Sequence, residues 1–235
     1  MKLTRVLTAL VLFGVAFAYV EAAVVVYLRA HYDPIRHGVH PKEASGELFP
    51  MLRLEHLEAA GPQYTHMLWT ELGRELATLV MLAAMGLAIG RNLREWLAGF
   101  MIAFGVWDIF FYVFLKLLID WPASVWTWDI LFLLPVPWVG PVISPVLVSV
   151  SMIVAGAAIF WRESHGRPIR FRWFHWLAII GGGLIVIVAF CWDWRNTAAG
   201  GWPNPFNWPL FIVGEAIGLA GFAHAYWSRQ PRSLD

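Results

Sequence analysis

Residues 96–118 read WLAGFMIAFGVWDIFFYVFLKLL, an apolar run whose only charged residues are Asp108 and Lys116. A run of about 20 apolar residues is long enough to cross the hydrocarbon core of a bilayer as a helix. A charged side chain near the centre of such a helix costs a few kcal/mol unless it faces protein or a wet cavity. The stretch therefore predicts a membrane-spanning helix and, at Asp108, a polar site inside the membrane.

The composition of the whole chain agrees with a membrane location. Of the 235 residues, 59% are apolar and 14% are charged, whereas a soluble domain carries about a quarter charged residues. The net charge of +1, with no basic run interleaved with aromatic residues, argues against nucleic acid as a partner. A single cysteine, Cys191, excludes an internal disulfide and a thiolate metal cage.

Apolar runs of similar length recur along the chain and predict an all-α, polytopic helical bundle. We expect a single transmembrane domain over residues 1–235 with about six spanning helices, and many of the 15 tryptophans fall at the predicted span ends, where their rings favour the headgroup layer. The predicted spans lie near 4–28, 67–89, 96–118, 143–161, 174–192 and 206–227.

The first span begins like a secretory signal peptide, with Lys2 and Arg5 ahead of an apolar run and the Ala16-Phe17-Ala18 triplet as a candidate cleavage site. The apolar run continues past that triplet to Leu28, which is the length of a full span. We therefore expect the segment to be kept as the first transmembrane helix.

Two connections are unusual. The loop over residues 29–66 contains a leucine-rich, charged stretch over 50–60 that predicts a short amphipathic helix on the membrane surface. The apolar segment Ile130–Val142 contains Pro135, Pro137 and Pro141. Proline breaks a regular helix, so this segment predicts a broken or re-entrant piece before the fourth span, or a kinked segment at the interface.

Basic residues predict the orientation. The two termini and the connections after the second and fourth spans hold most of the Lys and Arg residues. By the positive-inside rule these parts face the cytoplasm. Both termini are therefore predicted to be cytoplasmic.

The candidate site is a surplus of acids inside the spans. Counting about 1.5 Å per residue from each span's midpoint puts all of them at the midplane or in the outer half of the membrane. Such residues normally face a protein interior and act on protons, ions or ligands. The predicted proton- or cation-binding residues are Glu21, Glu71, Glu75, Asp108 and Glu215.

Three further side chains are expected to support these acids. Glu71 and Glu75 share one helix face, so Arg74 is a candidate to neutralise one of them. Tyr112 and Lys116 follow Asp108 at four-residue spacing and form a polar stripe, although Lys116 is also placed to pair with Asp120.

The acids support three functions. The first is a proton- or cation-handling protein, either a carrier or a proton relay, with an outward-facing cavity. The second is a membrane metalloenzyme acting on a lipid-soluble substrate, in which iron or manganese is held by carboxylates and one histidine: Glu21, Glu71, Glu75, Asp108 and His66. The third is a non-catalytic subunit of a larger membrane complex. Assembly of the chain as a homo-oligomer is a further alternative. The motifs of nucleotide-driven enzymes and of acyl hydrolases are missing.

Overall fold

A computed structural model describes residues 3–43 and 48–228. It confirms the predicted fold class, because the described residues form eight helices and a single two-stranded sheet. The order is α1 (Leu3–Val39), α2 (Leu54–Ala60), α3 (Pro62–Ile89), α4 (Leu93–Ile119), β1 (Trp128–Phe132), β2 (Trp138–Pro141), α5 (Ile143–Ser164), α6 (Trp173–Phe190), α7 (Trp194–Ala198) and α8 (Trp208–Trp227).

Six of these helices, α1, α3, α4, α5, α6 and α8, are long and apolar enough to cross a membrane. The chain is therefore a multi-pass membrane protein. Each of the six matches one predicted span to within a few residues, except that α1 continues well past Leu28, through Pro34, to Val39. The predicted loop over residues 29–66 is correspondingly shorter, and α2 lies within the stretch expected to form an amphipathic helix.

Local sequence signals set the ends of the central helix α4. The Asn92 side chain caps its first turn by accepting a hydrogen bond from the Glu95 backbone N–H at 3.1 Å. Asp120 ends the helix in the left-handed conformation with φ of 55°. Between these two residues α4 is the most buried of the six long helices, because α1, α3 and α5 all pack against it.

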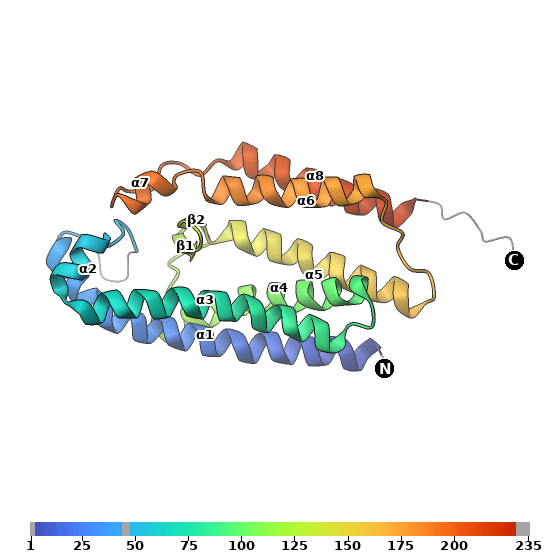
Figure 1. Cartoon of the computed structure of the whole chain (residues 1–235), viewed down its shortest axis with the longest axis horizontal. Helices are drawn as coiled ribbons and strands as arrows, with labels where there is room; N and C mark the ends of the chain where they lie inside the picture. The colour runs from blue at the N-terminus through green and yellow to red at the C-terminus, as the bar shows by residue number, and fades with distance from the viewer. Residues whose placement is uncertain (1–2, 44–47, 229–235) are drawn as a thin grey trace, which may run out of the picture.

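The helices form two groups (Figure 1). One contains α1, α3, α4 and α5, with buried side chains such as Leu10, Leu82 and Ala103 at its centre. The other is the α6–α8 pair, which lies along the top of the view in Figure 1 and packs mainly on itself. A Cβ added at Gly182 of α6 would come within 2.6 Å of the Gly214 carbonyl oxygen of α8, so glycine permits this close approach.

The proline-containing segment before α5 is a β-hairpin. β1 and β2 pair antiparallel, with Trp128 opposite Pro141 and Ile130 opposite Val139. Strand pairing satisfies part of the backbone that a broken helix would leave without hydrogen bonds. The hairpin stands beside the start of α5 and faces the α6–α8 pair (Figure 1).

Candidate functional site

A cavity of about 600 Å³ lies between the two helix groups. Its wall is formed by α1, α3, α4, α5, α6, α8 and the hairpin, and most of the lining side chains are apolar. All five carboxylates predicted from the sequence line it: Glu21, Glu71, Glu75, Asp108 and Glu215. The fold thus brings to one space acids that are up to about 190 positions apart in the chain, counting from Glu21 to Glu215.

Arg74 joins two of these acids. Its guanidinium forms ion pairs with Glu21 of α1 and Glu71 of α3, and its Nε donates to Glu71 Oε2 at 2.8 Å. Thr78 Oγ1 adds a hydrogen bond to Glu21 Oε1 at 3.1 Å. The sequence suggested Glu71 or Glu75 as the partner of Arg74. The structure adds Glu21 in place of Glu75, because α1 lies beside α3 at this level.

Glu75 instead holds the hairpin. Both of its carboxylate oxygens accept hydrogen bonds from the Leu133 backbone N–H, at 2.9 Å and 3.1 Å. Leu133 follows β1 at the tip of the hairpin. A carboxylate is a strong acceptor for an otherwise unpaired backbone N–H, so Glu75 ties the hairpin to α3.

Asp108 and Glu215 have only hydroxyl partners. Ser149 donates to Asp108 Oδ2 at 2.8 Å and Ser151 donates to Glu215 Oε2 at 3.0 Å, and both serines belong to α5. Neither acid forms an ion pair with any residue within 3–43 and 48–228. A hydroxyl donor carries no charge, so these two acids bring either a proton or an uncompensated negative charge to the cavity.

The hairpin supplies a sixth acid, Asp129, which the sequence did not single out. It is buried and accepts a hydrogen bond from Tyr112 at 2.8 Å. Burial raises the pKa of Asp129 to about 6, against the lowering effects of the Tyr112 hydroxyl and of nearby Arg29. The available signals were the run WDILF beside the prolines and the polar stripe over residues 108–116, which contains Tyr112.

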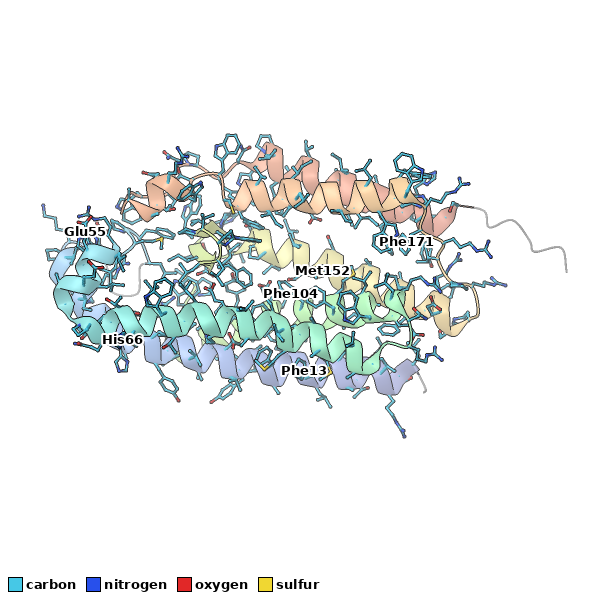
Figure 2. The ribbon with its side chains drawn as sticks, viewed as in Figure 1. Phe13, Glu55, His66, Phe104, Met152 and Phe171 are labelled. Atoms are coloured by element: carbon cyan, nitrogen blue, oxygen red, sulfur yellow. The ribbon has the colours of Figure 1, made fainter. Side chains whose placement is uncertain are left out.

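The remaining candidates lie apart from the cavity. Lys116 pairs with Asp120 at 2.7 Å, as its spacing predicted, and is about half exposed. His66 is exposed on the first turns of α3, at the end of the bundle seen on the left in Figure 2, and does not line the cavity.

The carboxylates and histidine proposed as metal ligands therefore do not meet as one set. Glu21 and Glu71 converge on Arg74, Asp108 lies against Ser149, and His66 lies outside. Among the residues that the structure describes, no group of three or more His, Cys, Asp or Glu side chains is close enough to hold a metal ion.

Comparison of the chain with protein-family models, with curated proteins and with solved structures found no match. The class of protein is set by the fold and the site: a multi-pass helical membrane protein with an acidic cavity inside the bundle.

Proposed function

We propose that this protein handles protons or cations in the cavity, as a carrier or as a proton relay. The supporting observation is that carboxylates from α1, α3, α4 and α8 line one space while Arg74 neutralises only part of their charge. Because a carboxylate inside a membrane protein costs free energy, it usually serves to bind a proton, an ion or a ligand.

Asp108 and Glu215 are the proposed exchanging groups. An ionised carboxylate without a cation is costly at this depth, and a bound proton or cation removes that cost. The serine hydroxyls on α5 orient each carboxylate but leave its second oxygen without a hydrogen bond from the described residues. That oxygen is available to bind the proton or cation.

The other acids have supporting roles in this proposal. Glu21 and Glu71 hold Arg74, which keeps one fixed positive charge beside the cavity. Glu75 and the Tyr112–Asp129 pair hold the hairpin and the end of α4 together at the predicted outer side. The extracellular location of that side stays a prediction. So do the partners: the lipid bilayer, and a second copy of the chain or a larger membrane complex.

The direct test is flux in reconstituted vesicles. Purified protein in proteoliposomes with an internal pH-sensitive dye is given a proton gradient, with and without Na⁺ or K⁺ outside. We expect Asp108→Asn and Glu215→Gln to lower the rate of pH equilibration by at least about tenfold, because each removes a proton-accepting group. Glu55→Gln, on the exposed surface helix α2 and outside the cavity, is the matched control.

Equal rates in protein-containing and empty vesicles would contradict the proposal. So would variants of Asp108 and Glu215 that both retain the wild-type rate while remaining monodisperse in detergent.

A further inference from the structure

The cavity is larger and more apolar than a bare ion requires. Its volume of about 600 Å³ lies within the range of roughly 300–1,000 Å³ that small organic ligands occupy. Aromatic side chains of α4, among them Phe104 and Phe111, form part of its wall. Phe104 and Met152, which also lines it, lie between the helix layers in Figure 2. The space suits a molecule with an apolar body.

Two tryptophans that line the cavity have buried indole N–H groups without acceptors. Trp107 is 7% exposed as a residue, and its Nε1–H has no partner among residues 3–43 and 48–228. Trp138 on β2 has an unpartnered Nε1–H in the same described part of the chain, and both tryptophans line the cavity. Because an unsatisfied buried donor lowers stability, each indole points to an acceptor supplied by a ligand.

The charge of the wall selects a cation. Asp108 and Glu215 are bonded only to serine hydroxyls, so a positively charged group would complete both sites. Phe104, Trp107 and Phe111 line the same cavity as Asp108, with the Trp107 ring in contact with the other two, and aromatic rings of this kind attract ammonium groups.

The arrangement of the helices favours entry from the lipid. The α6–α8 pair packs on itself and makes only limited contact with α5 and β2, and α3 has no extensive contact with either α6 or α8 over their described lengths. The cavity is nevertheless lined from both sides of this division. A lipid-soluble molecule that enters along this division would not cross the core formed by α1, α4 and α5.

We propose that the cavity binds a lipid-soluble amine that also carries an oxygen acceptor, as in an amino-alcohol amphiphile. Its ammonium group pairs with Asp108 or Glu215, its oxygen accepts the Trp107 N–H, and its apolar chain lies against α6 and α8. This assignment rests on the proposed cation-handling function and names the class of cation.

Binding of tritiated N-dodecylethanolamine to the detergent-purified full-length protein tests the assignment. Dodecylamine lacks the oxygen, 2-dodecyloxyethanol lacks the charge, and ethanolamine lacks the chain, so each competitor removes one proposed contact. We expect N-dodecylethanolamine to compete best, and the neutral ether-alcohol to bind at least about tenfold more weakly.

The variants assign the contacts. Asp108→Asn or Glu215→Gln should weaken binding of both amines by about tenfold. Trp107→Phe should weaken N-dodecylethanolamine by about fivefold more than it weakens dodecylamine, since only the first has the acceptor. Glu55→Gln and Trp69→Phe, both outside the cavity and on exposed positions, should bind like wild type.

Equal binding of the neutral ether-alcohol and the amino alcohol would overturn the assignment, as would wild-type binding by both carboxylate variants. An unchanged affinity in Trp107→Phe would overturn it as well. Proton flux measured on the same preparations separates the two proposals. Wild-type protein that conducts protons but does not bind the amine overturns only the ligand class. Wild-type protein that shows neither proton flux nor amine binding overturns the proposed function too.

Discussion

Arg74 sits at the point where α1 and α3 meet inside the bundle. Its side chain is 24% exposed, while the Glu21 side chain that it pairs with is only 4% exposed. One guanidinium serves Glu21 and Glu71 together, so removing it would leave two carboxylates without their cation. Buried acids of this kind depend strongly on their partner.

Arg74→Gln is therefore expected to lower the free energy of unfolding by about 3 to 5 kcal/mol, the usual cost of breaking a buried ion pair from one side. Thermal unfolding of the detergent-solubilised protein measures the loss. Lys116→Gln is the control, because the Lys116–Asp120 pair is exposed and such pairs contribute less than about 1 kcal/mol. Equal effects of the two substitutions would contradict the structure at Arg74.

Asp129 makes stability depend on pH. Its pKa is raised from 3.8 to about 6 in the folded protein, chiefly by burial. Between about pH 4 and pH 6 the folded state therefore holds more protons than the unfolded state, and stability falls as pH rises. Asp129→Asn, which still accepts from Tyr112, should remove the contribution of Asp129 to this slope, an effect on the order of 3 kcal/mol across the window. Thermal melts of the wild type and of Asp129→Asn from pH 4 to pH 7 measure this contribution. Equal dependence of stability on pH in the two proteins would contradict the prediction.

The hairpin is the element whose form was hardest to predict. Three prolines excluded a regular helix over Ile130–Val142, and the fold has none there. Strands were not predicted because each is short and neither shows a clear alternation of apolar and polar residues. The contact that holds the tip, from Leu133 to Glu75, spans 58 positions in the chain and leaves no local signal.

Removing the Glu75 carboxylate should release the hairpin. In Glu75→Ala the Leu133 N–H loses its acceptor, so amide hydrogen exchange across residues 128–141 should speed up by about tenfold. Glu75→Gln keeps one acceptor oxygen and should give a smaller change. Exchange by mass spectrometry distinguishes them, and protection that survives in Glu75→Ala would show that the hairpin is held by other contacts.

The α6–α8 pair offers a matched glycine test. A Cβ at Gly182 would lie 2.6 Å from the Gly214 carbonyl oxygen, whereas a Cβ at Gly181 would meet nothing within 4 Å. Gly182→Ala should destabilise the protein by about 1 to 3 kcal/mol through overpacking. Gly181→Ala should be neutral or slightly stabilising, since alanine favours helix. Thermal melts compare the two, and equal melting temperatures would contradict the close packing of α6 on α8.

At the scale of the whole molecule, the sequence predicted the fold class and named the acids that line the cavity. Spans follow from apolar length alone, so the six helices needed no tertiary information. The partners of the acids did not follow, because Ser149 and Ser151 are unremarkable residues of α5 and become donors only through packing. Asp129 was missed for the same reason: its burial depends on the hairpin folding against Tyr112.

The predicted orientation rests on the distribution of Lys and Arg along the chain. Labelling single cysteines placed at the exposed position Lys42 and at the partly exposed position Arg94, in a Cys191→Ser background, would test it in intact cells. An impermeant thiol reagent should reach position 42 and not position 94. The reverse pattern would invert the bundle and turn the cavity's hairpin end toward the cytoplasm.

The central claim is that Asp108 and Glu215 bind protons or cations in a shared, accessible cavity. Infrared difference spectroscopy between two pH values, on protein in H₂O and in D₂O, detects protonated carboxyl groups and their exchange. We predict carboxyl C=O bands that shift in D₂O and respond to pH or to an added cation, with one band lost in Asp108→Asn and another in Glu215→Gln. Spectra in which neither variant changes any carboxyl band would contradict the account.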